Sequence, residues 1–389
     1  MKILVPRQTK SGETRVSLTP TAAKRLIELG TDVDVQGGCG TGSHHGDDAY
    51  ETVGATVTPS HDDAALDLWS HADLVVTIHP PSLDQIQSLR SSATLIGMFD
   101  PFRNHDAVQA LASQRVTAFS MELLPRISRA QPMDVLSSQA NIAGYQAVIL
   151  AAEACPKIFP MMITAAGTIA PARVMVIGAG VAGLQAIATA KRLGAVVEAY
   201  DIRPEVEEQI QSLGARFIKL PAAKKDAATE GGYAKEQTAE ERKQQAELMA
   251  KHVVSADAVI TTAALFGKAP PMLIPADVVH RKEAGTVLVD LAADEQSGRG
   301  NCELTEPGKR ITTERGVTVE GHTNLPSLSP VHSSQMYAHN MFSFLKEIIV
   351  DGQVRLNTDD ELQRGPLLTH EGDIMHDMVK KVIEGNGGR

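Results

Sequence analysis

The sequence contains few aromatic residues, few cysteines and no excess of positive charge. Aromatic side chains make up 4% of the 389 residues, so the hydrophobic cores must be mainly aliphatic. The three cysteines form no C-x-x-C pair, which argues against a disulfide framework and favours a reducing cytoplasm. The formal net charge of −10, without a basic stripe, argues against a nucleic-acid partner. The spacing of His44, His45, His79 and His105 matches no ligand motif, so we expect no metal site.

Long uninterrupted hydrophobic runs are also absent. The most apolar stretch, residues 147–170, is broken by Glu153, Pro156, Lys157 and Pro160, whereas a membrane span needs about 20 nearly uninterrupted apolar residues. The N-terminus starts directly with an apolar run and lacks the basic region and cleavage site of a signal peptide. We therefore expect a chain that is soluble by itself and is not exported.

The length and the order of apolar segments predict two domains. Short apolar runs alternate with helical patterns, which indicates an α/β fold: two Rossmann-like, doubly wound parallel-sheet domains joined by long helices. The expected strands lie near residues 2–6, 33–35, 73–78, 94–98, 117–120, 174–177, 196–200, 217–220, 258–262, 287–290 and 317–321. Helices at 134–153 and 333–350 would carry the chain between the domains. We expect a discontinuous N-terminal domain (1–135 plus 330–389) around a nucleotide-binding domain (136–329).

The sharpest motif is Gly178-Ala-Gly180-Val-Ala-Gly183, which follows an expected strand and opens an expected helix. Its context matches the dinucleotide fingerprint, because a second strand ends in Asp201, about 20 residues further on. Gly178 would make the tight turn, Gly180 would let the backbone approach a pyrophosphate, and Gly183 would let helix and strand pack closely. The helix N-terminus would then offer free N–H groups to the phosphates.

The acid at the end of the second strand selects the nucleotide. Asp201 would accept hydrogen bonds from the ribose hydroxyls and repel a 2′-phosphate, which favours NAD(H) over NADP(H). Arg203, two residues further on, points the other way, because it could pair with the 2′-phosphate of NADP(H). Val181, Ala182 and Ile202, within or beside these segments, are expected contacts of the same nucleotide.

Several segments carry a resemblance to a known family. Residues 126–145 (RISRAQPMDVLSSQANIAGY) resemble the loop and linker helix of the NAD(H)-binding components of proton-translocating NAD(P) transhydrogenases, within the alanine dehydrogenase/transhydrogenase family. Residues 178–195 resemble the nucleotide motif of that family, residues 231–235 (GGYAK) its mobile loop, and residues 321–326 (GHTNLP) its domain-closing segment. The resemblance covers most of the chain.

The resemblance implies roles for individual residues. Four side chains would hold the nicotinamide carboxamide and its ribose: Arg126, Gln131, Asp134 and Ser137. Gln131 would lie nearest the approach of a second ring, and Tyr233, beside Gly232, would close over the bound nucleotide. Simpler interpretations stay open, since Arg126 and Asp134 could form a surface ion pair and Asp134 or Ser137 could cap the following helix. Pro132 departs from the family and stiffens this loop.

Alanine dehydrogenases share the implied architecture and offer an alternative function. They place a substrate-binding Lys and a proton-transferring His where this chain has His79 and Asp100, leaving only Arg15 as a carboxylate binder. Oxidative deamination needs a general acid or base, whereas hydride transfer between two nicotinamide rings needs only their juxtaposition. A third possibility is a non-catalytic NAD(H)-sensing module, which the nucleotide motif equally allows.

The resemblance therefore implies an enzyme component that transfers hydride between bound NADH and NADP⁺ held by a separate NADP(H)-binding component, coupled to proton translocation. The sequence ends at Arg389 without membrane helices, so a membrane-spanning proton-channel subunit would be another polypeptide. The family also implies a homodimer, peripheral to the inner membrane on its cytoplasmic side through partner subunits.

Overall fold

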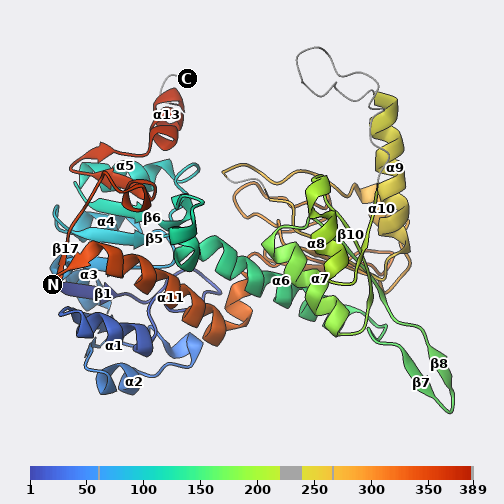
Figure 1. The fold of residues 1–389 in the computed structure, drawn as a ribbon, viewed down its shortest axis with the longest axis horizontal. Coiled ribbons are helices and arrows are strands. Elements are labelled where there is room, and N and C mark those ends of the chain that lie inside the picture. Colours follow the sequence, from blue (N-terminus) through green and yellow to red (C-terminus); the bar gives the residue numbers. More distant parts are fainter. Residues whose placement is uncertain (60–61, 220–238, 265–266, 387–389) are drawn as a thin grey trace. The chain divides into compact units, whose positions relative to one another are not determined.

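The chain folds into two compact units (Figure 1) in a computed structural model that describes residues 1–59, 62–219, 239–264 and 267–386. Unit 1 combines Met1–Gln139 with Pro326–Arg389, and unit 2 is Ala140–Leu325. The first crossing falls inside helix α6 (Val135–Ala154), and the second falls just before helix α11 (Pro330–Ile348). Both crossings lie a few residues from the boundaries expected from the sequence.

Unit 1 is built on an eight-stranded sheet with the order β19-β18-β6-β5-β4-β1-β2-β3. Six of its strands are parallel and follow the Rossmann order 3-2-1-4-5-6, while β18 and β19 extend the sheet antiparallel. The strands are β1 (Lys2–Val5), β2 (Asp32–Gln36), β3 (Thr56–Thr58), β4 (Leu74–Val76), β5 (Thr94–Gly97), β6 (Thr117–Ser120), β18 (Leu367–His370) and β19 (Asp373–Ile374).

Helices cover both faces of this sheet, because successive strand side chains point to opposite sides. Ile3 and Val5 are buried with α1, α2 and α11, whereas Leu4 is buried with α3, α4, α5 and α13. The helices are α1 (Pro20–Glu28), α2 (Asp47–Thr52), α3 (Asp62–His71), α4 (Leu83–Ser88), α5 (His105–Ser113), α12 (Glu361–Arg364) and α13 (Asp377–Asn386). A small hairpin, β16 (Ile349–Val350) and β17 (Gln353–Val354), follows α11. Unit 1 is thus doubly wound.

Unit 2 repeats the same arrangement with seven strands in the order β11-β10-β9-β12-β13-β15-β14. All are parallel except the edge strand β14. The strands are β9 (Arg173–Ile177), β10 (Val196–Tyr200), β11 (Arg216–Phe217), β12 (Ala258–Thr261), β13 (Val287–Asp290), β14 (Arg310–Thr312) and β15 (Thr318–Glu320), and the helices are α7 (Val181–Arg192), α8 (Glu207–Ser212), α9 (Ala239–Ser255) and α10 (Ala276–His280). The predicted fold class is therefore confirmed for both units.

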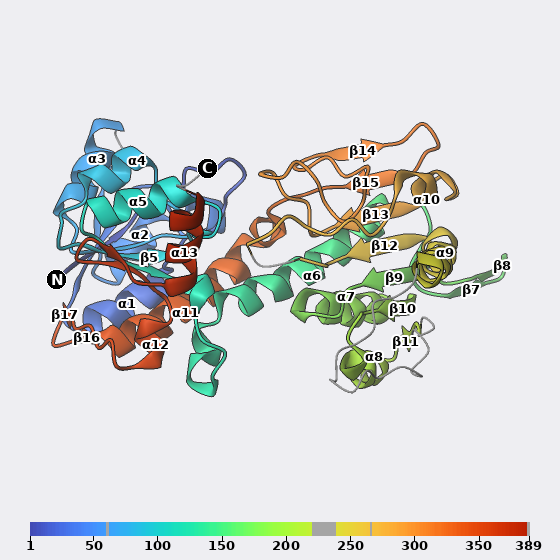
Figure 2. The same ribbon diagram turned by 90° about the horizontal axis from the view of Figure 1, so that it is seen from above.

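One hairpin of unit 2 has no counterpart among the expected strands. Strands β7 (Met162–Thr164) and β8 (Gly167–Ile169) pair only with each other and project from the rest of the unit (Figure 2). Every residue of both strands is exposed, and the side chain of Ile163 is 74% exposed. The hairpin presents exposed apolar side chains that pack against no core cluster of the described residues.

Candidate functional site

The glycine loop of unit 2 connects the central strand β9 to helix α7, at the point where the strand order reverses. Gly178 adopts φ = +100°, a left-handed conformation that favours glycine. A Cβ on Gly183 would meet the carbonyl oxygen of Gly178, so this glycine is needed for the close approach of helix and strand. Thr262, after β12, donates from its hydroxyl to the same carbonyl at 3.1 Å. The loop is thereby fixed from the neighbouring strand.

Gly180 differs from its two neighbours in the motif. Its φ of −73° suits any residue, and a Cβ added there would meet nothing within 4 Å. The residue is exposed at the N-cap of α7, and no side chain caps the first turn of that helix. The missing side chain therefore serves neither folding nor packing. It leaves open space directly before unpaired helix N–H groups, an arrangement that fits the pyrophosphate of a dinucleotide.

Asp201 lies beside this loop, at the end of β10, and is engaged within the protein. Its carboxylate accepts from the Ala179 N–H at 2.7 Å, from the Arg203 N–H at 2.8 Å and from the Arg203 side chain at 3.0 Å. Burial alone would raise the pKa of Asp201, but these hydrogen bonds and the guanidinium charge hold it below its usual value. The acid is therefore an anion that already braces the glycine loop.

The other expected nucleotide contacts of unit 2 surround the same loop. Val181 is 39% exposed at the start of α7, Ala182 is partly buried beside it, and Ile202 is 84% exposed after Asp201. A Cβ on Gly144 of α6 would meet the backbone of Ala182, so α6 packs closely against the start of α7. Gly232 and Tyr233 lie outside the described residues.

Two further residues shape this end of the unit 2 sheet and are not predicted from the sequence. The side chain of Asn301 accepts from the Ala263 N–H at 3.0 Å and donates to the carbonyls of Ala263 and Pro271 at 2.8 Å, which fixes the loop after β12. Asp290, fully buried at the end of β13, accepts from the hydroxyls of Thr261 and Thr305. An acid ending an apolar strand was an available signal for Asp290, whereas nothing local marks Asn301.

The four residues assigned to the nicotinamide end lie together in unit 1, around the start of α6. Gln131 and Arg126 are exposed, Gln131 within the 3₁₀ helix η3 (Ser128–Met133). Asp134 accepts from the Ser137 N–H at 2.9 Å and from its hydroxyl at 2.5 Å. Asp134 is thus the residue that caps α6. Within the described part of the chain, Arg126 forms no ion pair with Asp134. The 3₁₀ helix η3 is held by Asn340, which donates to the Pro132 carbonyl at 2.8 Å.

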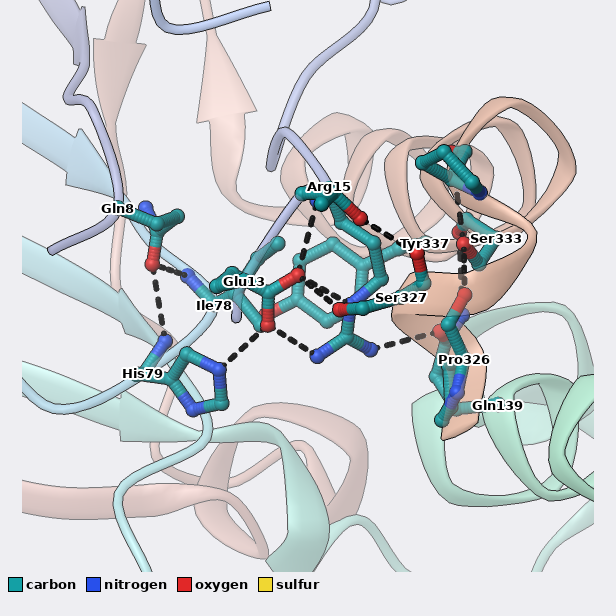
Figure 3. Close-up of polar contacts among 12 residues, drawn as sticks. Gln8, Glu13, Arg15, Ile78, His79, Gln139, Pro326, Ser327, Ser333 and Tyr337 are labelled. Atoms are coloured by element: carbon teal, nitrogen blue, oxygen red, sulfur yellow. Dashed lines mark hydrogen bonds and ion pairs between the residues drawn. The ribbon is translucent and has the colours of Figure 1, made fainter. Parts of the chain in front are cut away.

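A second polar cluster lies where the strand order of the unit 1 sheet reverses, at the carboxyl ends of β1 and β4 (Figure 3). The side chain of Glu13 is fully buried and accepts from Arg15 Nε at 2.8 Å, from Arg15 Nη2 at 2.6 Å and from the Ser327 hydroxyl at 2.7 Å. His79 Nε2 lies 2.6 Å from the same carboxylate, which requires a proton on that nitrogen. Burial would raise the pKa of Glu13, but Arg15 and His79 hold it far below its usual value.

This cluster changes the role expected for Arg15. Its remaining guanidinium nitrogen donates to Gln139 at 2.8 Å, and its side chain is 3% exposed. A substrate carboxylate could reach Arg15 only by breaking buried, charged hydrogen bonds. Asp100 follows β5 as expected and is exposed, with its N–H donating to the buried Glu122 at 2.6 Å. Arg15 is therefore engaged within the cluster in this conformation, and its role as a carboxylate binder stays a prediction.

The described ranges contain neither a candidate metal-ion cluster nor a candidate membrane-spanning helix. No group of three or more His, Cys, Asp and Glu side chains is arranged to hold a metal ion there. Within the same ranges no helix is both long enough and apolar enough to cross a membrane.

Comparison with known proteins gives the family. The model of the N-terminal domain of alanine dehydrogenase/PNT matches residues 4–143, and that of the C-terminal domain matches residues 147–377. The chain is 44% identical to the first polypeptide of the NAD(P) transhydrogenase alpha subunit of Rhodospirillum rubrum, over 97% of this chain and 98% of that protein. The solved transhydrogenase from Sinorhizobium meliloti is 40% identical, with a TM-score of 0.82 over 97% of this chain and all of that one. An alanine dehydrogenase from Halomonas elongata is 26% identical over 98% of this chain and 97% of that protein. The chain therefore belongs to the alanine dehydrogenase/PNT family of oxidoreductases, and its resemblance to the NAD(P) transhydrogenase alpha subunits is much higher than to the alanine dehydrogenase.

Proposed function

We propose that this chain is the NAD(H)-binding component of a proton-translocating NAD(P) transhydrogenase. It would transfer hydride between bound NADH and NADP⁺ that a partner component holds. The observation that carries the proposal is the glycine loop of unit 2, in which Gly180 leaves open space before the uncapped N-terminus of α7. The 44% identity to a transhydrogenase alpha subunit supports the choice of reaction.

The unit 2 residues would bind the pyrophosphate and the adenosine half of the nucleotide. Backbone N–H groups between Gly178 and Gly183 would hold the pyrophosphate, and Asp201 would accept from the ribose hydroxyls. All the acceptor positions of Asp201 face donors of Ala179 and Arg203, so the half-exposed Arg203 side chain would have to move aside. The exposed Ile202 offers an apolar surface next to the ribose.

The unit 1 residues would hold the nicotinamide end. The carboxylate of Asp134 already fixes the Ser137 hydroxyl, which leaves the exposed Gln131 and Arg126 as the side chains free to meet the ring carboxamide. A bound nicotinamide supplies the hydride itself, so the protein need only position the ring and exclude water. Tyr233 and Gly232, outside the described residues, stay proposed as part of a closing loop.

The alternative of an amino-acid dehydrogenase receives no support from unit 1. Such an enzyme needs a cation for the substrate carboxylate, and Arg15 is occupied by Glu13 and Gln139. His79, at the position of a substrate-binding lysine, is paired with the same Glu13. No feature of the described residues favours a purely sensing module over the enzyme component.

The proposed partners are a separate NADP(H)-binding component, a membrane-spanning proton-channel subunit and a second copy of this chain. The exposed apolar side chains of the hairpin, among them Met162, Ile163 and Ile169, are a surface suited to contact between two copies. Through its partners the chain would be peripheral to the inner membrane, on the cytoplasmic side.

The test is a reconstitution. The purified chain is mixed with an NADP(H)-binding component and NADP⁺. The hydride donor is an NADH analogue with a shifted absorption band, so that its oxidation is followed separately from the formation of NADPH. Transfer that depends on both proteins is the expected result. Reduction of NAD⁺ by alanine with the chain alone would instead establish the amino-acid dehydrogenase, and nucleotide binding without any transfer would leave a sensing module.

A further inference from the structure

A pocket of about 630 Å³ lies on the face of unit 1 that carries α1 and α11, which run side by side in Figure 1. This volume is in the range of pockets that bind small organic molecules, roughly 300–1,000 Å³. All of its lining residues belong to unit 1, and neither the glycine loop nor the Glu13 cluster contributes to it. The proposed function leaves this pocket without a role.

Arg25 supplies the charge of the pocket. Its guanidinium stacks on the ring of Phe342, with the central carbon 3.7 Å from the ring centroid. Stacking uses the flat face of the guanidinium and leaves its N–H edges available. No carboxylate of the described residues pairs with Arg25, and no acidic residue lines the pocket. On a chain with a net charge of −10, a cationic pocket without a carboxylate is a specific feature.

His45 supplies an unpaired polar atom. It lines the pocket and follows His44, which has a left-handed backbone (φ = 59°). The Nε2 atom of His45 is buried and has no hydrogen-bond partner among the described residues. Burial and the neighbouring His44 lower the pKa of His45. Since Nε2 has no exposed surface, a ligand in the pocket would satisfy it only after the His45 ring turns toward the pocket.

Helix α11 supplies both further imidazoles and an apolar floor. His332 and His339 are exposed and lie about two turns apart, so they project from the same side of the helix. Met336 lies between them, and Phe342 lies one turn beyond His339. The pocket thus combines donors and a cation at its rim with thioether and aromatic surface below.

We propose that this pocket, the Arg25 pocket, binds a small organic anion with an apolar body. A carboxylate or phosphate head group would contact the N–H edges of Arg25, and the apolar body would lie on the half-buried Met336. The shared chemistry of the two head groups is a planar or tetrahedral oxyanion that accepts from a guanidinium edge. None of the residues proposed to contact the nucleotide lines this pocket.

The test uses 8-anilinonaphthalene-1-sulfonate, a fluorescent aromatic anion, titrated into the full chain in saturating NAD⁺ so that the nucleotide site cannot contribute. We expect one site per chain. Phenyl phosphate and phenylacetate are then added as competitors. If only one competitor displaces the probe, it identifies the preferred head group. If both displace it, the pocket recognises the negative charge and does not distinguish phosphate from carboxylate. If neither displaces it, the proposal is overturned.

Variants show whether the probe binds in the Arg25 pocket. Arg25→Met should weaken probe binding at least tenfold, whereas Lys24→Met, the exposed neighbour on the same helix, should leave it unchanged. Because Arg25→Met also removes the stacking on Phe342, Met336→Glu provides a second variant, which places a negative charge on the pocket floor and should abolish binding. Thermal unfolding reports whether each variant is folded. Folded Arg25→Met and Met336→Glu proteins that bind the probe as the parent does would refute the Arg25 pocket.

Discussion

The three glycines of the unit 2 loop look alike in the sequence but serve different ends, and single substitutions separate them. Gly180→Ala should leave the melting temperature nearly unchanged, because its backbone is unstrained and its Cβ would point into open space. It should weaken NADH binding about tenfold or more, about 1.4 kcal/mol, because that space is where the pyrophosphate would lie. Fluorescence titration measures the affinity and calorimetry the stability.

Gly183→Ala is the matched contrast. Its Cβ would clash with the Gly178 carbonyl, so it should destabilise unit 2 by about 1–3 kcal/mol and weaken binding only through the disturbed loop. If Gly180→Ala bound NADH as tightly as the parent, the pyrophosphate would not lie over this loop.

The proposed role of Asp201 in nucleotide preference predicts an effect of its partner Arg203. Because Arg203 occupies acceptor positions of Asp201 and is half exposed, its removal should free the carboxylate for the ribose. It should also remove a cation that could attract a 2′-phosphate. Arg203→Ala is therefore expected to increase the preference for NADH over NADPH, measured as the ratio of the two dissociation constants.

The companion change Asp201→Asn should reduce the same ratio, because the amide no longer repels a phosphate. It should also lower the melting temperature, since the charge that braces the Ala179 N–H is lost. A ratio that falls in Arg203→Ala would mean that the guanidinium, rather than the acid, is what recognises the ribose side.

At the scale of elements, the end of helix α9 depends on a lysine far from it in sequence. The Lys282 amine is buried and donates to the carbonyls of Val253 and Ala256 at 2.6 and 2.9 Å. It thereby satisfies the Ala256 carbonyl and adds a second, shorter hydrogen bond to the Val253 carbonyl, which also accepts from the Ala256 N–H at 3.3 Å. Burial lowers the pKa of Lys282 to about 8. Lys282→Met should destabilise unit 2 by about 1–3 kcal/mol at pH 9.5, because the buried Ala256 carbonyl loses its donor and the Val253 carbonyl loses the shorter of its two hydrogen bonds.

Because the pKa of Lys282 is lowered in the folded protein, its contribution to the free energy of unfolding depends on pH. The unfolded chain keeps the amine protonated up to about pH 10.4. Between about 8 and 10.4 the unfolded state therefore binds the proton and the folded state does not, so stability from this group rises with pH. The destabilisation caused by Lys282→Met should then be smaller at pH 7 than at pH 9.5 by about 1–2 kcal/mol, measured by urea unfolding. An equal difference at both values would mean that the amine titrates as it does in water.

How far the elements are predictable depends on where they lie in the sheets. Strands buried on both faces, such as β1 and β9, are continuous apolar runs and are predictable from the sequence. The edge strands β3 and β14 contain polar residues and have only three residues each, so no apolar run marks them. Strands β18 and β19 join the unit 1 sheet from the other end of the chain, and only tertiary pairing reveals them.

At the scale of the whole molecule, some parts of the candidate site are predictable from the sequence and others are not. The glycine loop and Asp201 are predictable, because one βαβ unit contains all of their spacing. The Glu13 cluster is not, because its members come from residues 13, 79, 139 and 327 and meet only when the fold brings strand ends and chain crossings together. Arg15 alone resembles a ligand-binding arginine, and the fold adds that it is paired with the buried Glu13.

The proposed role of the exposed unit 1 loop in positioning the nicotinamide predicts an effect on the rate of hydride transfer. Gln131→Asn should leave NADH binding nearly unchanged, because most contacts of the nucleotide would be with the glycine loop of unit 2 and the Asp201 region. It should slow hydride transfer to NADP⁺ in the reconstituted system by about tenfold to a hundredfold, because shortening the side chain shifts the ring and small misplacements are costly to rate.

Ser128→Ala, another exposed position in the same 3₁₀ helix, is the matched control and should change neither binding nor rate. Equilibrium titration gives the binding term, and single-turnover kinetics with the NADP(H)-binding component gives the rate of the chemical step apart from product release. Since η3 is held to α11 through Asn340 and the Pro132 carbonyl, Gln131→Asn should not unfold the loop, so a loss of rate can be read as a change in ring position. A variant that transfers hydride at the full rate would remove Gln131 from the positioning of the nicotinamide and leave Arg126 as the remaining candidate in this loop.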